Sequence, residues 1–342
     1  MSAILVVLRT IANVFNRAVA QGIPLLFGST GEILTEKSGN LNLGIPGIMY
    51  VGGISGVIGA FLYENSFVGH YEDMNPFLTI AIPFFATLIG ALIMGLIYCF
   101  LTVTLRANQN VTGLALTTFG VGFGNFFGAS LIKLVDTELP NVTLTHTSDM
   151  FRTPLPFADD LSWFGTMFFS YGFLAYLAII LAIIAAVLLR RTRVGLQLRA
   201  VGENPATADA AGINVNRYKY VSTCVGSVIA GLGGLYYVMD YANGIWSNNA
   251  FGDRGWLAIA LVIFAIWKPD LSIFGSILFG ALYVVNNYLT DMGFTPSMAT
   301  QELIRMLPYA VTILVLVITS MRKKREYQAP GSLGLSYFRE DR

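Results

Sequence analysis

Long apolar segments alternate with short polar ones along almost the whole chain. A bilayer core about 30 Å thick needs roughly 20 apolar residues per helix, and many of the segments have about that length. They predict an all-α integral membrane protein with about nine transmembrane helices, eight or ten being the alternatives. The predicted spans lie at residues 17–34, 43–63, 77–105, 111–132, 164–189, 218–240, 255–268, 271–290 and 303–321.

Two of these spans and the N-terminal stretch carry a weaker signal than the rest. The first span contains Glu32 and several small polar residues, and the seventh is short enough to be tilted, kinked or half-spanning. Residues 1–16 are expected to form an N-terminal interfacial helix, or else to be part of a longer first span. Residues 17–321 then form a single transmembrane domain, and residues 322–342 form a basic cytoplasmic tail.

Positive charge is distributed unequally between the two sets of loops. Residues 190–217 and 322–325 are rich in lysine and arginine, whereas residues 133–163 are mainly acidic. Because loops with an excess of lysine and arginine stay on the cytoplasmic side, the basic set is predicted to be cytoplasmic and the acidic segment external. Nine spans then place the N-terminus outside and the C-terminus in the cytoplasm. The chain is expected to be a multi-pass protein of the plasma membrane.

The composition supports a membrane protein and excludes several other classes. Apolar residues make up 55% of the chain and charged residues 12%, against about 25% charged in soluble domains. The net charge of +1 implies no general attraction to nucleic acid. There are only two cysteines, both inside apolar segments, so neither a disulfide scaffold nor a multi-cysteine metal site is predicted, and the two histidines lie too far apart in the sequence to suggest a metal site.

The sequence also lacks familiar catalytic motifs. It contains no Gly-Lys dipeptide, and therefore no Walker A loop, and neither G-x-S-x-G nor H-E-x-x-H is present. No pair of carboxylates is expected deep in a span, and Asp240 lies near the outer end of the sixth, which argues against proton coupling. We therefore expect no enzymatic activity and no cofactor in this chain, and an energy source outside it.

Two of the apolar spans are interrupted by glycine, proline and asparagine. One break covers residues 38–47 and the other residues 243–255, and the predicted topology puts them on opposite sides of the membrane. Irregular backbone at membrane depth is tolerated only where it lines a cavity or is buried in protein. The two breaks predict an inverted repeat with broken helices, as in many transporters. The alternative is that glycine-rich spans simply pack tightly.

The basic loop at residues 190–217 contains a short helix of its own. Asn204 is a good N-cap, Pro205 suits the first helical position, and Gly212 suits the C-terminal end. Alanines cover the helix between them, and small side chains allow another protein to approach closely. A loop this long with a capped helix is usually functional, although a plain surface loop with a helical turn is the alternative.

Three stretches of the sequence resemble one family. Residues 31–47 resemble the signature G-E-x-x-x-E-[KR]-[AS]-G-x-x-N-[IL]-G-x-x-G, and residues 199–213 resemble a cytoplasmic R-A-x-G-x-N segment. Residues 113–120 resemble a third block. The chain is similar, over about residues 17–320, to permease subunits of bacterial ABC importers, in the class that includes ribose and branched-chain amino-acid permeases. It looks most like permeases that import nucleosides with basic-membrane-protein-type lipoproteins, but it carries Pro46 where relatives often have an acidic residue.

The resemblance implies a division of labour between subunits. Two permease subunits, expected to be non-identical, would form the pathway across a bacterial plasma membrane, and an external lipoprotein would deliver the substrate. Two cytoplasmic ATPase domains would bind ATP and Mg²⁺. The helix at 204–212 would be the coupling helix that docks on the ATPase. The residues expected at that contact are Gly202, Glu203, Asn204, Pro205, Ala206, Asp209, Ala210, Ala211 and Gly212.

A nucleoside pathway needs aromatic faces for the base and amide groups for the polar edges of base and ribose. The candidates are Asn40, Asn42, Phe119, Asn125, Phe126, Tyr237, Trp246, Asn249 and Trp256. Aromatic residues are common in any membrane protein, so core packing or an interfacial belt is the alternative for each ring. Simple sugars and branched-chain amino acids remain alternative substrates, and an ATP-independent transporter or a membrane scaffold remains an alternative class.

Overall fold

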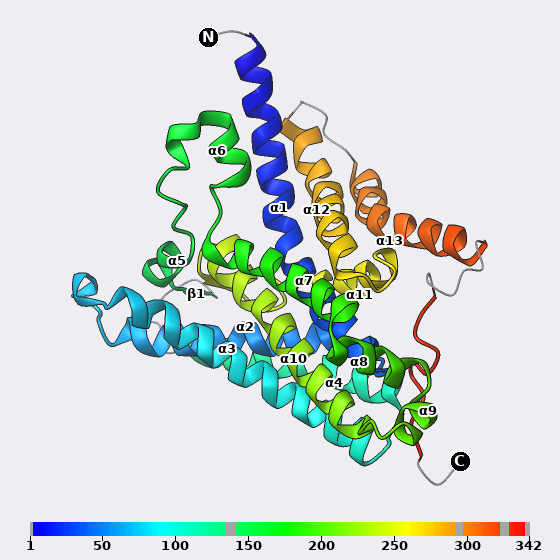
Figure 1. Ribbon diagram of the computed structural model, residues 1–342. Helices are drawn as coiled ribbons and strands as arrows, with labels where there is room; N and C mark the ends of the chain where they lie inside the picture. Colours follow the sequence, from blue (N-terminus) through cyan, green and yellow to red (C-terminus); the bar gives the residue numbers. More distant parts are fainter. Residues whose placement is uncertain (1–2, 134–140, 292–296, 322–327, 339–342) are drawn as a thin grey trace.

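The chain is almost entirely helical, with one two-stranded ribbon (Figure 1). The computed structural model describes residues 3–133, 141–291, 297–321 and 328–338. The longer helices are α1 (Ala3–Glu36), α2 (Ile45–Asn65), α3 (Pro76–Cys99), α4 (Gln109–Ile132), α7 (Phe173–Arg191), α10 (Val215–Tyr236), α12 (Pro269–Asp291) and α13 (Met298–Met321). The shorter elements are α5 (Thr145–Phe151), α6 (Ser162–Phe168), α8 (Arg193–Glu203), α9 (Pro205–Ala210), α11 (Arg254–Phe264), β1 (Val142–Thr143) and β2 (Ile245–Trp246).

Six helices of the described residues are long and apolar enough to cross a bilayer: α2, α3, α4, α7, α10 and α13. They match the second, third, fourth, fifth, sixth and ninth predicted spans. The fifth is shorter than predicted, because residues 164–168 belong to the separate helix α6 and α7 begins only at Phe173. The chain turns between them at Gly172, where a Cβ atom would lie 2.2 Å from the Phe151 carbonyl oxygen.

The expected boundary at residue 16 is not a break in the structure. Helix α1 continues from Ala3 to Glu36 with Pro24 inside it. The sequence from Ala3 to Gln21 contains neither glycine nor proline, so nothing there ends the helix. The first residues are therefore part of one long first helix, whose N-terminal end extends beyond its neighbours in Figure 1.

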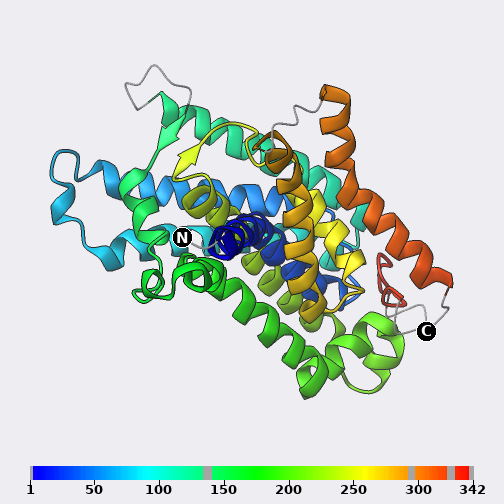
Figure 2. The same cartoon turned by 90° about the horizontal axis from the view of Figure 1, so that it is seen from above.

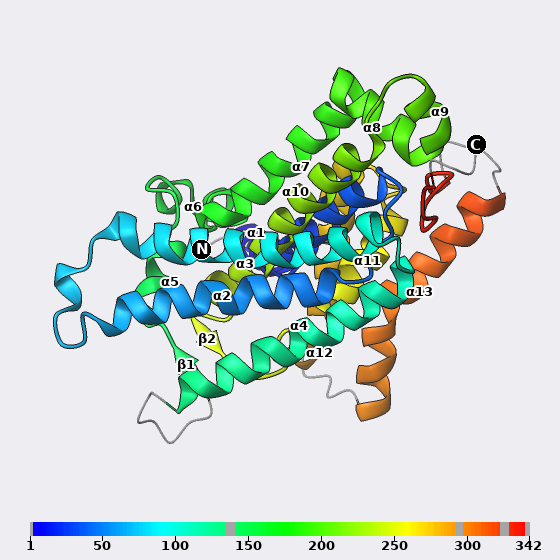
Figure 3. The ribbon, with the colours of Figure 1, turned by 90° about the horizontal axis from the view of Figure 1, so that it is seen from below.

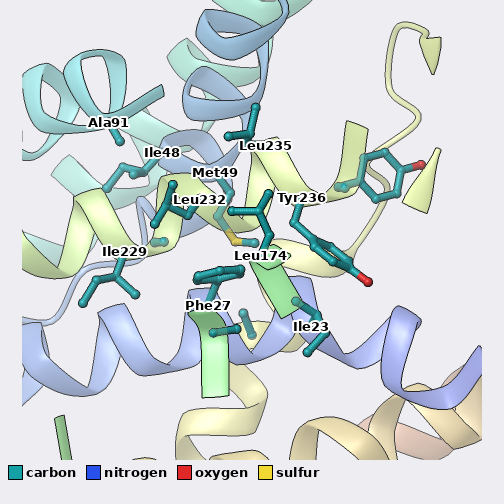
Figure 4. Packing of buried hydrophobic residues seen from close by; sticks show 14 of the residues in the cluster. Ile23, Phe27, Ile48, Met49, Ala91, Leu174, Ile229, Leu232, Leu235 and Tyr236 are labelled. Atoms are coloured by element: carbon teal, nitrogen blue, oxygen red, sulfur yellow. The ribbon is translucent and has the colours of Figure 1, made fainter. Parts of the chain in front are cut away.

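The core forms where α1, α2 and α10 cross. Gly31 of α1 and Gly226 of α10 lie against each other, so that a Cβ atom on either would lie 2.2–2.3 Å from the other's carbonyl oxygen. This close approach lets large side chains interdigitate on both sides of the crossing, including Phe27, Met49 and Tyr236 (Figure 4). The packing fixes α1 against the two helices that flank the interrupted segments.

The two ends of the helix bundle differ. Helices α8 and α9 lie beside the C-terminal residues at one end, whereas α5 and the connection between α2 and α3 lie at the other (Figures 1, 2 and 3). Residues 141–163, part of the acidic segment predicted to be external, lie at this second end. Strand β1 pairs with β2, Val142 opposite Trp246, and Glu64 at the end of α2 accepts hydrogen bonds from the backbone and hydroxyl of Thr147 at 3.0 and 2.6 Å.

Candidate functional site

The two predicted helix breaks meet in the folded chain. A Cβ atom on Gly255, at the start of α11, would lie 2.4 Å from the α-carbon of Pro46, at the start of α2. Helix α11 has 11 residues and is therefore about 16 Å long, roughly half of a bilayer core. The first N–H groups of a helix have no partner within it and carry partial positive charge. We call the place where these two N-termini touch the junction.

A hydrogen-bonded triad lies next to the junction. The Tyr50 hydroxyl of α2 donates to Asn125 Oδ1 of α4 at 2.5 Å, and the backbone N–H of Asn249 donates to the Tyr50 oxygen at 2.9 Å. Asn125 Nδ2 donates to Asn249 Oδ1 at 2.9 Å, which closes the ring of contacts. The segment before α11 is thereby held against α2 and α4 by groups that can also bond a polar ligand.

Aromatic rings enclose this triad on one side. Trp246 packs edge-on to Tyr50 with 5.1 Å between ring centroids, and Phe251 lies 4.8 Å from Tyr237. The Trp246 indole N–H is buried without a hydrogen-bond partner among the described residues. The junction cluster consists of Tyr50, Asn125, Tyr237, Trp246, Asn249 and Phe251. It combines ring faces with amide and hydroxyl groups, which is the chemistry suited to a polar aromatic molecule.

A small cavity adjoins the cluster. Its volume is about 170 Å³, and its lining includes Gln21, Tyr241, Arg254, Tyr283 and Arg305. The Arg254 guanidinium lies 4.6 Å from the Tyr237 ring centroid and also faces the rings of Tyr241 and Tyr283. Cation–π contacts of this kind hold the buried guanidinium beside the cluster, together with its hydrogen bonds to the Phe251 carbonyl oxygen at 3.0 Å and to Gln21 Oε1 at 3.3 Å.

Sequence analysis identified four members of the junction cluster, Asn125, Tyr237, Trp246 and Asn249, and missed two. Tyr50 and Phe251 resembled ordinary core residues, although Tyr50 lies three residues after the first break and Phe251 lies inside the second, which was the available signal. The other predicted rings lie elsewhere. Phe119 and Phe126 are 54% and 67% exposed on the outer face of α4, and Trp256 is 37% exposed on α11, so none of the three is part of the cluster.

Asn40 and Asn42 lie apart from the cluster, in the buried turn between α1 and α2. Asn40 Nδ2 donates to Thr223 Oγ1 at 3.0 Å, and Asn42 Oδ1 accepts from the Gly44 N–H at 2.9 Å. The backbone N–H of Asn42 donates to Glu32 Oε1 at 3.0 Å. These two asparagines therefore shape the turn that leads into α2.

Two carboxylates at the end of α1, one within the predicted first span and one just after it, are buried inside the protein. Glu32 and Glu36 are 0% and 3% exposed. Glu32 is tied to the turn through Asn42, and Glu36 accepts a hydrogen bond from the indole N–H of Trp267. Each thus has a structural partner, which explains how polar groups are accommodated at this depth. The described residues contain no group of three or more histidine, cysteine, aspartate or glutamate side chains placed to hold a metal ion.

The predicted short helix of the basic loop is present as α9. Asn204 Oδ1 accepts from the Thr207 N–H at 3.0 Å, and Gly212 follows with a φ of +82°, a conformation that favours glycine. The helix itself covers Pro205–Ala210, shorter than the predicted 204–212, and α8 directly before it was not predicted. Of the residues expected at the docking contact, the exposed ones are Glu203, Asn204, Ala206, Ala210, Ala211 and Gly212, and the half-buried ones are Pro205 and Asp209.

Gly202 does not lie on a docking surface. It is buried at the end of α8, where a Cβ atom would lie 2.3 Å from the Lys37 carbonyl oxygen and 3.2 Å from the Gly39 nitrogen. Its small size is required for packing on the turn between α1 and α2. The packed contacts therefore run without interruption from α9 through α8 and this turn to the start of α2, where the junction lies.

Comparison with known proteins agrees with this arrangement. Residues 14–316 match the family described as the permease component of a branched-chain amino acid transport system. The nucleoside ABC transporter permease protein NupC of Lactococcus lactis is 32% identical over 316 residues, covering 91% of this chain and 93% of that protein. The putative glucose ABC transporter permease protein TsgC13 of Haloferax volcanii is 28% identical, covering 96% and 98% of the two chains.

A third relative points to the same family. The guanosine ABC transporter permease protein NupQ of Bacillus subtilis is 27% identical over 323 residues, covering 93% of this chain and 94% of that protein. These matches cover almost the full length of both partners, so an ATP-independent transporter and a plain scaffold are set aside. Such a permease works with an ATPase and a substrate-binding protein and does not itself hydrolyse ATP. The chain belongs to the branched-chain amino acid transport system permease family and is the multi-pass membrane component of an ABC transporter.

Proposed function

We propose that this permease carries nucleosides into the cell. The observation that supports this most directly is the junction cluster, in which aromatic rings lie on one side of a triad of two amides and one phenol. A nucleobase offers a flat ring for stacking and a polar edge for amide hydrogen bonds. Two of the relatives described above carry nucleoside or guanosine transport in their names.

The cluster favours a weak, transient site over a tight one. The amides of Asn125 and Asn249 already bond each other and Tyr50, so a ligand would exchange those hydrogen bonds for its own rather than gain new ones. The net gain from such an exchange is small. Weak binding suits a pathway, because the substrate must leave it again, and specificity would come from an external lipoprotein that delivers the substrate.

A sugar is the second candidate. One relative is named a putative glucose permease, and the amide triad alone would suit hydroxyl groups. The rings of Trp246, Tyr237 and Phe251 favour a nucleoside, because a stacking platform is more useful to a base than to a hydroxyl-rich pyranose. A branched-chain amino acid would need partners for a carboxylate and an ammonium group together, and the cluster contains no carboxylate.

For the assembly, we propose that α9 is the coupling helix and that it docks on the cytoplasmic ATPase. The exposed residues of α9 and of the two positions after it are Ala206, Thr207, Ala210, Ala211 and Gly212, small side chains that permit close approach of another backbone. The end that carries α8, α9 and the basic tail is then cytoplasmic, in a bacterial plasma membrane. A second, non-identical permease subunit and an external lipoprotein would complete the transporter.

We further propose that about nine spans are arranged as an inverted repeat of α1–α4 and α10–α13. Helix α1 packs on α10, α11 and α12, and α10 packs on α1, α2 and α3. Helix α2 likewise packs on α3 and α4, and α11 on α12 and α13. Such matched pairings are what a two-fold relation would produce. They bring together the N-termini of α2 and α11, the two helices that follow the breaks.

This arrangement suggests how ATP drives transport. Closure of the ATPases would move α9 and, through the contact of Gly202 with Lys37, the turn before α2. Because α2 and α11 touch at the junction, a small displacement there would open or close the cluster toward one side. Two packings of the junction, biased by ATP, would give alternating access.

The experiment that tests this function is transport by the reconstituted complex. Proteoliposomes would contain the permease with its second permease subunit and ATPase, and would be given a loaded binding protein and labelled guanosine or uridine. We expect ATP-dependent uptake that unlabelled nucleosides block and that ribose, glucose and leucine do not. Uptake blocked by glucose or leucine in place of nucleosides would contradict the substrate assignment.

A further inference from the structure

The segment Pro330–Phe338 is docked on the same end of the molecule as α8 and α9 (Figure 1). The backbone N–H of Ser332 donates to the Gly202 carbonyl oxygen at 2.9 Å, and the Ser332 hydroxyl donates to the same oxygen at 2.6 Å. Ser332 is only 6% exposed. Next to it, the N–H of Gly331 donates to Glu203 Oε2 at 3.3 Å. The segment is thereby fixed to the end of α8 through main-chain and side-chain hydrogen bonds.

The same segment is also bonded to the turn between α1 and α2. The N–H of Gly334 donates to the Gly39 carbonyl oxygen at 3.2 Å. Gly39 has a φ of +88°, and a Cβ atom there would lie 2.7 Å from the Ser332 hydroxyl, so the turn has the shape that admits the segment. Gln109 of α4 accepts from the Leu41 N–H at 2.7 Å and donates to the Leu335 carbonyl oxygen at 3.3 Å, which joins the turn and the segment from the other side.

A third set of contacts reaches α9 and the connection between α3 and α4. The Tyr337 hydroxyl donates to Asp209 Oδ2 of α9 at 2.8 Å. The Arg106 guanidinium lies 4.7 Å from the centroid of the Phe338 ring. The Tyr337 ring packs on a small apolar cluster that includes Ala208 of α9. One nine-residue stretch therefore touches α9, α8, the turn before α2 and the start of α4.

These contacts differ from those of a tail held only by charge. The residues from Pro330 to Phe338 contain no lysine, arginine, aspartate or glutamate. Three of their hydrogen bonds are accepted by the carbonyl oxygens of Gly39 and Gly202, which lie on the route from α9 to the junction. A helix of six residues such as α9 has little stability of its own, so its position depends on what holds it from outside.

We propose that Pro330–Phe338 is a clasp that makes α9 and the turn before α2 move as one unit, with Tyr337 and Ser332 as positioning residues for energy coupling. The proposal rests on the proposed function, in which α9 receives the motion of the ATPase. Loss of the clasp leaves the ATPase able to bind and hydrolyse ATP but lets α9 move without carrying the turn with it. The expected defect is therefore less substrate transported for each ATP hydrolysed.

The test compares variants in the complete transporter reconstituted in liposomes with a loaded binding protein. Tyr337→Phe removes the bond to Asp209 and keeps the ring, Ser332→Ala removes the hydroxyl contact, and a chain ending at residue 329 removes the clasp. We expect substrate transported per ATP to fall roughly two- to ten-fold in the point variants, the range that one lost hydrogen bond gives, and further in the shortened chain. ATPase capture and receptor-independent hydrolysis stay at the wild-type level.

Two control variants separate this proposal from the coupling-helix assignment. Tyr63→Phe removes a tyrosine hydroxyl that accepts from the Asn75 N–H at 3.1 Å at the other end of the molecule, and it should leave transport per ATP unchanged. Ala206→Arg changes the exposed surface of α9 and should abolish ATPase capture. Suppose that Ala206→Arg abolishes ATPase capture, while Tyr337→Phe, Ser332→Ala and the shortened chain all transport the normal amount of substrate per ATP. The clasp proposal is then wrong, and the assignment of α9 as the coupling helix is retained. If Ala206→Arg still captures the ATPase, the coupling-helix assignment fails, and the clasp fails with it.

Discussion

Gly255 at the start of α11 packs directly on Pro46 at the start of α2, so closely that a Cβ atom on Gly255 would lie 2.4 Å from the Pro46 α-carbon. Two interruptions that lie more than 190 residues apart in the sequence are one structural feature in the folded chain. The N-terminal ends of two helices and the surrounding amides and rings thus converge at one place. The proposed transport mechanism depends on this contact.

The first prediction concerns that contact. Gly255→Val should push α11 away from α2 and destabilise the permease by about 1–3 kcal/mol, because overpacking a tight site costs about that much. Nucleoside uptake should fall more than the amount of folded protein. Thermal unfolding in detergent and uptake per folded transporter measure the two effects. Gly122→Ala is the matched control, since a Cβ atom there meets nothing within 4 Å; equal losses in the two variants would contradict the prediction.

The second prediction concerns the amide triad. Asn249→Ala removes the acceptor for Asn125 Nδ2. Asn125→Ala removes both the donor to Asn249 Oδ1 and the acceptor for the Tyr50 hydroxyl. Each should raise the KM for nucleoside uptake by about ten-fold, the equivalent of ~1.4 kcal/mol for one lost polar contact, while ATP hydrolysis remains normal. Phe126→Leu on the exposed face of α4 serves as the control, with wild-type KM expected. A KM that stays unchanged in both asparagine variants would remove the triad from the pathway.

The third prediction separates Gly202 from Ala211, which sequence alone had grouped together. Gly202→Val should clash with the Lys37 carbonyl and lower the thermal stability of the permease, because Gly202 is buried. Ala211→Trp lies on the exposed end of α9 and should leave stability unchanged but weaken capture of the ATPase. A thermal-shift assay and an affinity capture of the ATPase distinguish the two variants. The opposite pattern, with normal stability for Gly202→Val, would show that this close contact is not required.

The fourth prediction concerns the buried end of α1. Glu36→Ala removes the acceptor for the Trp267 indole and leaves that buried donor without its partner. An unsatisfied buried donor costs about 1–3 kcal/mol, so the variant should unfold at lower temperature. Glu36→Gln keeps an acceptor oxygen and should recover most of the loss. If Glu36→Gln is as unstable as Glu36→Ala, the negative charge rather than the hydrogen bond is what the site requires.

Local signals in the sequence were sufficient for the six long apolar helices and for the two breaks. Glycine, proline and asparagine interrupt helices for reasons internal to a few residues, so residues 38–47 and 243–255 were recognisable without a structure. The cap of α9 was predictable for the same reason, because Asn204 bonds a neighbour three positions away. That the two breaks touch is a long-range contact, and no local pattern reports it beyond the general expectation of a repeat.

The residues that were missed or misplaced are those whose roles depend on long-range contacts rather than on local sequence signals. Tyr50 and Phe251 are residue types common in any core, and only their positions, just after the first break and inside the second, distinguish them. Gly202 was assigned to a docking surface because a small residue can serve either an external contact or an internal one, and burial decides which. The segment Pro330–Phe338 shows no apolar periodicity, and its hydrogen-bond partners, both backbone and side-chain groups, lie far away in the chain.

The most direct test of the central claim is a cross-link across the junction in the working transporter. Cysteines at Asn125 and Asn249, which contact each other beside the junction, would be introduced in a background in which Cys99 and Cys224 are replaced. They would be oxidised in liposomes that carry the complete transporter and labelled nucleoside at a saturating concentration. If the junction is the moving part of the pathway, oxidation stops uptake, reduction restores it, and the yield of cross-link changes when ATP is added. Full uptake by the oxidised transporter, with the cross-link formed to completion, would contradict the account.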